Sequence, residues 1–180
     1  MYRALYLQNP NHLSELECIL SQTTFKFAGK DGSDLFMDGV DRSSEITTAE
    51  VTESVSRISA IPKVREKLVE YQREMADGMD VVLEGRDIGT VVFPDADHKF
   101  FLIADIHERA KRRMQEMEAK GEIVSLPALT EELEERDRID STREHSPLKK
   151  AEDAVEIDTT GISIEEQVNR IVEIVNKTIK

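Results

Sequence analysis

A polar loop between two apolar runs constrains the fold of this chain more than any other segment. Residues 81–83 (VVL) lead into residues 84–90 (EGRDIGT), and a second apolar run follows at residues 99–104 (KFFLIA). Short continuous apolar runs are typical of strands that are buried on both faces, as in a parallel sheet covered by helices. Ligands of such sheets bind outside the carboxyl ends of the strands. We therefore expect the loop to contribute to a binding site.

Arg86 and Asp87 give this loop its chemistry. They lie between Gly85 and Gly89, and glycine allows the backbone to approach a ligand closely. An arginine suits a phosphate, and an aspartate suits an amine or a hydroxyl group. Taken alone, the loop is equally consistent with a surface turn in which the two side chains pair with each other.

The rest of the chain alternates between helical and strand patterns. Pro62 is placed to begin a helix, Asp105 begins another, and Ser163 opens a capping box before a C-terminal amphipathic helix. Residues 154–157 are predicted to form a strand, whereas residues 23–39 alternate around a glycine-bearing turn, which predicts a β-hairpin. We predict an α/β fold: a parallel sheet with flanking helices and a small antiparallel insert.

The charge balance excludes several classes of partner. The chain has 37 acidic and 24 basic residues and a net charge of −13, which opposes broad binding to nucleic acid or to anionic membranes. No apolar stretch approaches the roughly 20 residues that span a bilayer, and the first residues do not resemble a signal peptide. The single cysteine, Cys18, suits a reducing compartment. We expect a cytoplasmic protein that binds neither nucleic acid nor membrane.

Arginines recur in three sets, which we take as candidates for binding an anion. Their members are Arg109, Arg112 and Arg113 on one predicted helix, Arg136 and Arg143 with Asp140 on another, and the separated Arg3, Arg65 and Arg86. The spacing of i, i+4 and i+7 places the second set on one helical face. Each of the two helical sets alone is better explained as a solvated face with intrahelical salt bridges, such as Glu108 to Arg112. Together they match phosphoryl transfer, which depends on positioning and on cationic stabilisation.

Other chemistries find little support in the sequence. The four histidines have no metal-ligand spacing, and the chain has no Cys/His cluster and no Gly-x-Ser-x-Gly motif. We therefore assign no metal ligands and no nucleophile.

Several segments together resemble bacterial-type cytidylate kinase. They are GRDIGTVVFPDA, KFFLIA, HERAKRRM and ERDRIDSTREHSPL, and the resemblance extends from Tyr2 to the C-terminal helix. It implies the fold of the P-loop nucleoside monophosphate kinases. It also implies a transferase of pyrimidine metabolism that moves the γ-phosphate of ATP to CMP or dCMP with Mg²⁺, and that acts as a monomer.

The resemblance assigns roles to the candidate residues. The cytosine would be read by Ser56, Arg65 and Asp87. The acceptor phosphate would be held by Arg3, Arg86 and Arg143, and the ribose by Arg136 and Asp140. A mobile lid would carry Arg109, Arg112 and Arg113, of which the last two would reach the donor phosphates. The residue types agree, since an aspartate accepts from the cytosine amine and arginine forks suit a phosphate.

The resemblance also implies a division of the chain. Residues 1–180 would form a single kinase-like domain. Within it, residues 23–62 would be a CMP-binding insert, residues 105–145 the lid and the helix after it, and residues 146–180 a core strand with the C-terminal helix.

The P-loop of the family has no counterpart in these residues. The pattern G-x-x-x-x-G-K-[ST] does not occur; the pair Gly29-Lys30 has no glycine five residues earlier and is followed by Asp31. We expect the first, central strand and the P-loop to be missing through truncation, leaving a chain that is inactive and poorly stable alone. A protein or fragment that binds CMP without catalysis, with no ATP site, is the alternative. A purely structural chain with solvated arginines is the third interpretation.

Overall fold

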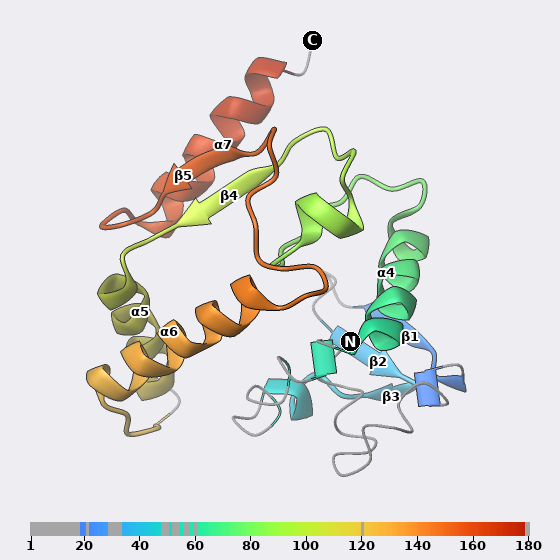
Figure 1. Cartoon of the computed structure of the whole chain (residues 1–180), viewed down its shortest axis with the longest axis horizontal. Helices are drawn as coiled ribbons and strands as arrows, with labels where there is room; N and C mark the ends of the chain where they lie inside the picture. Colours follow the sequence, from blue (N-terminus) through green and yellow to red (C-terminus); the bar gives the residue numbers. More distant parts are fainter. Residues whose placement is uncertain are drawn as a thin grey trace. The chain divides into compact units, whose positions relative to one another are not determined.

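A computed structural model gives the structure of this chain. It describes residues 19–20, 22–28, 34–47, 51, 55, 58–59, 61–119 and 121–178. The chain divides into two compact units, Met1–Leu83 and Glu84–Lys180, which we describe separately (Figure 1).

A small antiparallel sheet lies in the first unit. Its strands are β1 (Phe25–Ala28), β2 (Asp34–Met37) and β3 (Val40–Asp41), in that spatial order. The pairing of β1 with β2 confirms the predicted hairpin, whose turn lies outside the described residues. The third strand, which we did not predict, follows a tight turn in which Asp38 and Gly39 both have positive φ. A short 3-10 helix, η2 (Glu45–Thr47), comes next.

Helix α4 (Pro62–Ala76) contributes to the core of this unit. It begins at Pro62 as predicted, because proline has no N–H to leave unsatisfied in the first turn and its φ is already helical. Val64 and Leu68 are buried on one face of α4 and cluster with Leu20 and Ile58. Tyr71, from the same helix, packs edge-on against Phe25 at 5.6 Å between ring centroids, linking the helix to β1. This burial of apolar surface is what holds the unit together.

The second unit contains a two-stranded parallel sheet of β4 (Phe100–Ile103) and β5 (Val155–Asp158). Both strands were predicted, although β5 begins one residue later than expected. A single turn of π-helix, η3 (Ile88–Val92), precedes β4. These elements confirm a mixed α/β architecture with one antiparallel and one short parallel sheet.

Three longer helices complete the second unit: α5 (Ile106–Ala119), α6 (Leu126–Thr142) and α7 (Ile164–Thr178). Each begins with a side-chain cap. Asp105 accepts the first free N–H groups of α5, Ser125 accepts from α6, and Ser163 with Glu166 forms the predicted capping box of α7. Helices α5 and α6 pack against each other (Figure 1). None of the helices in the described part of the chain has the length and apolar character needed to traverse a bilayer.

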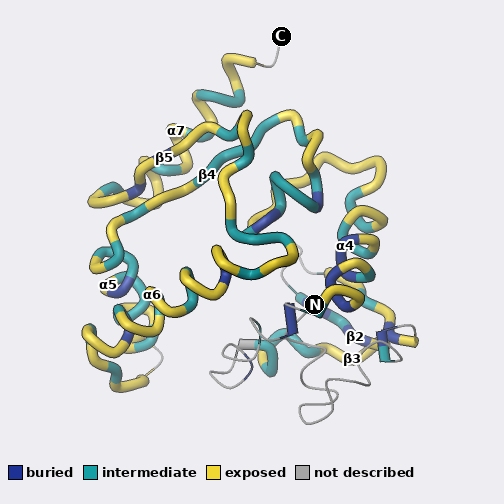
Figure 2. The backbone as a smooth tube through the Cα atoms, viewed as in Figure 1, coloured by how far each residue is buried: buried dark blue, intermediate teal, exposed yellow. Residues whose placement is uncertain are grey.

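One predicted strand is wrong. Residues 81–83 have no strand structure, and Val81, Val82 and Leu83 are all exposed. The stretch of chain that follows α4 is coloured as exposed in Figure 2. A strand of a parallel sheet needs a neighbour that accepts its backbone hydrogen bonds. Among the described residues β4 pairs with β5 alone, so this apolar run has no strand beside it and remains a connection without regular secondary structure.

Candidate functional site

The loop that carries Arg86 and Asp87 has a well-defined backbone. The carbonyl of Asp87 accepts the N–H groups of Thr90, Val91 and Val92, at 3.3, 2.9 and 3.4 Å. This tight turn draws the side chain of Asp87 inward, so that the residue is only 7% exposed. Gly85 lies so close to the turn that a Cβ there would come within 2.9 Å of a side-chain carbon. The backbone of the loop therefore fixes the positions from which the side chains of Arg86 and Asp87 extend.

Asp140, near the end of α6, is surrounded by three arginines. Its carboxylate oxygens lie 3.2 Å from Nε of Arg86, 3.9 Å from Nε of Arg136 and 3.7 Å from Nη1 of Arg143. The side chain of Asp140 is only 5% exposed. A buried carboxylate needs such cationic partners. The spacing predicted from the sequence thus does gather this set around one charge.

Arg143 is held by the end of α6 as well as by Asp140. It is the C-terminal capping residue of the helix, where the backbone turns to an extended conformation. Its Nε donates to the carbonyl of Ser146 at 2.6 Å, and the N–H of Leu148 donates to the carbonyl of Asp140 at 2.7 Å. These bonds fold the following segment back onto the helix end and fix the position of the guanidinium group.

Asp137, one turn before Asp140, joins two further elements. Its Oδ1 accepts from Nη1 of Arg86 at 3.2 Å, and its Oδ2 accepts from Nη2 of Arg109 at 2.5 Å. Burial alone would raise the pKa of Asp137, but the hydrogen bonds and charges of Arg109 and Arg86 outweigh that effect and lower the pKa. Asp137 is therefore ionised near neutral pH and bridges α5 to the loop.

These residues form what we call the arginine cluster: Arg86, Arg109, Arg136 and Arg143 with Asp137 and Asp140. Four guanidinium groups face the two carboxylates of the cluster, so positive charge is in excess there, although Glu132 also acts on Arg136. Burial, followed by the repulsion from Arg86, lowers the pKa of Arg136 in spite of the attraction of Asp140. A group with this excess of positive charge favours an anion, and a phosphate monoester at neutral pH carries nearly two negative charges.

The other two arginines of α5 lie outside the cluster. Arg112 donates to the carbonyl oxygen of Thr159 at 2.5 Å and to Glu108 at 3.1 Å, and so ties α5 to the end of β5. Arg113 pairs with the exposed Glu116 at 3.3 Å. The Glu108–Arg112 pair is the intrahelical salt bridge that the sequence offered as the alternative to a ligand site.

The remaining candidates belong to the other unit or are not described. Arg65 is buried on α4, in the unit Met1–Leu83, whereas Asp87 is in the unit Glu84–Lys180. Arg3 and Ser56 lie outside the described residues. The roles expected for Ser56, Arg65 and Asp87 in reading cytosine, and for Arg3 in holding the acceptor phosphate, therefore remain predictions.

Sequence reasoning missed Asp137. A signal was available, because Asp137 precedes Asp140 by three residues and so lies on the same face of α6. The predicted set of Arg136, Asp140 and Arg143 did not include it. The structure shows that Asp137 contacts two of the candidate arginines.

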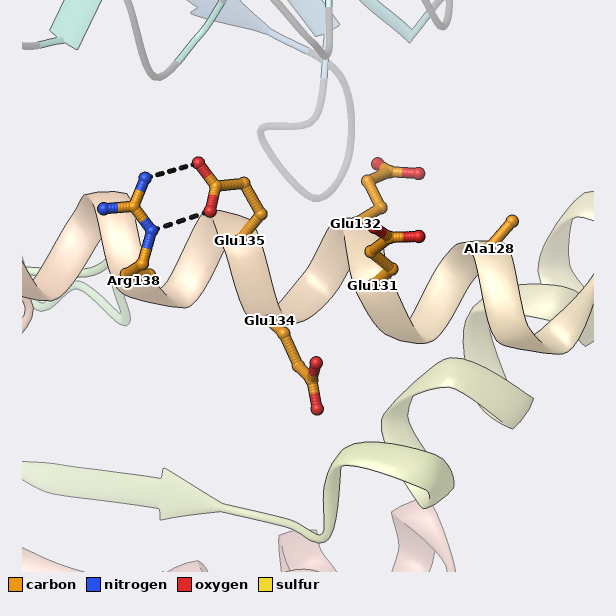
Figure 3. A pocket seen from close by; sticks show the side chains of 6 residues that line it. All are labelled: Ala128, Glu131, Glu132, Glu134, Glu135 and Arg138. Carbon is orange, nitrogen blue, oxygen red and sulfur yellow. Dashed lines mark hydrogen bonds and ion pairs between the residues drawn. The ribbon is translucent and has the colours of Figure 1, made fainter.

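A hollow along α6 is lined by carboxylates rather than by cations. It is bordered by Ala128, Glu131, Glu132, Glu134, Glu135 and Arg138 (Figure 3). Its one cation, Arg138, is engaged with Glu135 through two hydrogen bonds of 2.7 and 2.6 Å. Such a surface repels phosphate, so we place no nucleotide there. Within the described ranges, no three acidic, histidine or cysteine side chains come together as metal ligands.

Comparison with known proteins gives one consistent result. The family model for cytidylate kinase matches residues 1–177. A cytidylate kinase of Lactobacillus johnsonii is 48% identical over 163 residues, which are 90% of this chain and 71% of the relative. Those of Lactobacillus gasseri and Listeria welshimeri are 46% and 43% identical, and the matches cover 100% and 99% of this chain and 81% and 83% of the relatives.

Proposed function

This chain belongs to the cytidylate kinase family, and from that membership we propose that it serves to transfer the γ-phosphoryl group of ATP to CMP or dCMP, giving CDP or dCDP. The family is one of nucleotide phosphotransferases with the fold of the P-loop nucleoside monophosphate kinases. The observation that carries the proposal for this chain's own residues is the arginine cluster, which combines an excess of positive charge with a loop whose backbone is well defined.

The cluster supports a role in holding the acceptor. Arg86 and Arg143 would grip the phosphate of CMP, together with Arg3. Arg136 and Asp140 would contact the ribose hydroxyls. A planar guanidinium forms paired hydrogen bonds with phosphate oxygens, so two fixed arginines would both bind the acceptor and aim its attacking oxygen. Binding of this kind converts the transfer into a reaction between positioned groups.

Selectivity for cytosine is proposed for Ser56, Arg65 and Asp87. A carboxylate accepts a hydrogen bond from the exocyclic amine of cytosine, whereas the carbonyl that uracil has at that position would meet it with repulsion. The burial of Asp87 supports this proposal, since a shielded carboxylate discriminates more strongly than a solvated one.

The donor side rests on α5. Arg109, Arg112 and Arg113 would neutralise the phosphates of ATP, as lid residues that exclude water from the transfer. Arg109 already belongs to the arginine cluster, whereas Arg112 would have to exchange its bonds to Thr159 for bonds to phosphate.

Mg²⁺ would enter this reaction with ATP, and when bound it would neutralise charge on the donor phosphates. The described residues do not form a ligand set for a resident metal, and the two aspartates of the cluster are engaged by arginines. No step of the proposed transfer therefore depends on a metal held by these residues.

We also propose the division of the chain that the family resemblance implies, with residues 23–62 as the CMP-binding insert and residues 105–145 as the lid and the helix after it.

A second candidate function concerns the polypeptide of these 180 residues by itself. The pattern G-x-x-x-x-G-K-[ST] is absent from it, and that pattern supplies the backbone cradle and lysine for ATP phosphates in P-loop enzymes. We propose that this polypeptide alone binds CMP but turns over ATP slowly or not at all.

Two measurements test these proposals. In isothermal titration of the 180-residue polypeptide we expect CMP to bind more tightly than cytidine and more tightly than UMP. Arg86→Met should remove the advantage of CMP over cytidine, and Glu135→Gln, on the outer face of α6, should retain it. Equal affinities for CMP and cytidine contradict the assignment of the cluster to phosphate. A coupled assay for ADP release with CMP then decides between catalysis and binding alone.

A further inference from the structure

The guanidinium group of Arg86 is held on two sides by α6. Its Nε lies 3.2 Å from Oδ2 of Asp140, and its Nη1 lies 3.2 Å from Oδ1 of Asp137. Among the described residues, Nη2 makes no hydrogen bond, whereas Nη1 donates to Asp137. The two carboxylates thus fix the plane of the group and leave its middle nitrogen available to an incoming oxygen.

Asp137 also determines where Arg109 lies. While Oδ1 of Asp137 contacts Arg86, its Oδ2 contacts Nη2 of Arg109, which comes from α5. One carboxylate therefore holds two cations from different elements beside each other. Without it the two guanidinium groups would repel each other, and long side chains that lose a partner regain rotational freedom.

We propose that Asp137 is a positioning residue for phosphate recognition, which orients Arg86 toward the acceptor phosphate and holds it beside Arg109, the arginine proposed for the donor phosphates. This inference deepens the proposed function and rests on it. It differs from the role given to Asp140, which would itself contact the ribose. Asp137 acts on the ligand only through the arginines that it orients.

The direction in which Asp137→Asn changes the affinity for CMP distinguishes a positioning role of Asp137 from an effect of its charge alone. Removing the negative charge of Asp137 makes the cluster more positive, and a more positive site attracts phosphate more strongly. If only charge mattered, Asp137→Asn would strengthen CMP binding. If orientation dominates, the same change weakens it, because an asparagine can accept from one arginine but presents a donor to the other.

The experiment compares CMP with cytidine on four versions of the chain by isothermal titration. Asp137→Asn should weaken CMP binding about tenfold and leave cytidine binding unchanged, as expected for the loss of one coupled contact. Asp137→Glu keeps the charge but moves the carboxylate by one methylene, and it should also weaken CMP. Glu135→Gln removes the same charge two residues away, where Glu135 pairs with Arg138, and it should bind both ligands as the wild type does.

A double-mutant cycle supplies the readout that a purely structural role does not change. In an Arg86→Met background, Asp137→Asn should have little further effect on CMP, because Asp137 acts through Arg86. Additive losses in the cycle overturn the inference, and they point to a general loss of folded structure. Thermal unfolding of each variant accompanies the titrations, and if Asp137→Asn does not fold, Asp137→Glu decides the question.

The remaining outcomes are distinct. If Asp137→Asn or Asp137→Glu binds CMP as tightly as the wild type or more tightly, the inference is wrong while the proposed function stands. If the wild type itself shows no preference for CMP over cytidine, both are wrong.

Discussion

Asp140 offers the sharpest test of whether the arginine cluster is held together by charge. We consider Asp140→Asn, which keeps the size of the side chain and its ability to accept a hydrogen bond. In the wild type, the carboxylate meets three arginines at 3.2, 3.7 and 3.9 Å and is only 5% exposed. After the change, Arg86, Arg136 and Arg143 keep their charges but lose the carboxylate that they share, and only Arg86 retains its contact with Asp137.

The magnitude follows from the burial of the partners. Removing one member of a fully buried ion pair costs about 3–5 kcal/mol. Here the side chains of Arg86 and Arg136 are 31% and 33% exposed, so water compensates part of the loss. Arg143 is nearly buried and gains little from water. We therefore expect Asp140→Asn to lower the free energy of unfolding by about 2–3 kcal/mol.

Urea denaturation followed by circular dichroism measures this change without any nucleotide. The control is Glu135→Gln, on the exposed side of the same helix, which should leave the midpoint of unfolding unchanged. The loss in Asp140→Asn should persist at high salt, because buried pairs are screened weakly. If Asp140→Asn unfolds at the same urea concentration as the wild type, the cluster is not held by this carboxylate and the reasoning fails.

Three further results are expected. The pKa of Asp137 is lowered by Arg109 and Arg86 against the effect of burial. The ionised side chain of Asp137 therefore stabilises the fold above the ordinary aspartate pKa, and this stabilisation is lost as the pH falls through the lower pKa of the folded state. Acid titration of the wild type should show a steeper loss of stability below about pH 4 than Asp137→Asn does. Gly85→Ala places a Cβ 2.9 Å from Cγ1 of Ile88, and thermal unfolding should show a loss of about 1–2 kcal/mol. Arg112→Met removes the bonds from α5 to Thr159, and urea denaturation should show a loss of about 1–2 kcal/mol.

Each of these results has a matched control. For the acid titration, Glu135→Gln should follow the wild-type curve, and a curve for Asp137→Asn that also does so contradicts the assigned pKa. Gly89→Ala would meet the flexible stem of Lys99 at 3.2 Å and should cost less than Gly85→Ala; the reverse order contradicts the packing argument. Arg113→Met, which removes only the pair with Glu116, should be milder than Arg112→Met; equal effects show that Arg112 does not anchor α5.

Local patterns in the sequence predicted the elements whose stability is local. Pro62 begins α4, and Ser163 with Glu166 caps α7, because proline geometry and capping bonds depend on neighbours a few residues away. The segments that became β4 and β5 were also predicted: β4 (FFLI) is short and continuously apolar, whereas β5 (VEID) is short and alternates apolar with acidic residues.

The failure at residues 81–83 has the opposite cause. Hydrophobicity alone indicated a buried strand there, but strand formation depends on a neighbour far away in the sequence. The exposure of Val82 shows what happens to such a run when no strand lies beside it in the described chain.

The part of the candidate site that lies on one helix was also predictable, because helical spacing is a local pattern. Helical spacing placed Arg136, Asp140 and Arg143 together, and the structure shows this. Helical spacing does not indicate that Arg109 contacts Asp137 whereas Arg112 contacts Thr159, because those contacts depend on how α5 packs against α6 and β5. Single-sequence patterns carry no information on which of three neighbouring arginines faces another helix.

The division of the chain has a consequence for selectivity. The described residues proposed for the phosphate, Arg86 and Arg143, both belong to the unit Glu84–Lys180, whereas the proposed readers of the base, Arg65 and Asp87, come one from each unit. The part of the proposed phosphate site that the structure describes therefore lies within one unit. Two guanidinium groups that bind a phosphate do not distinguish one base from another, so selectivity has to come from residues other than Arg86 and Arg143.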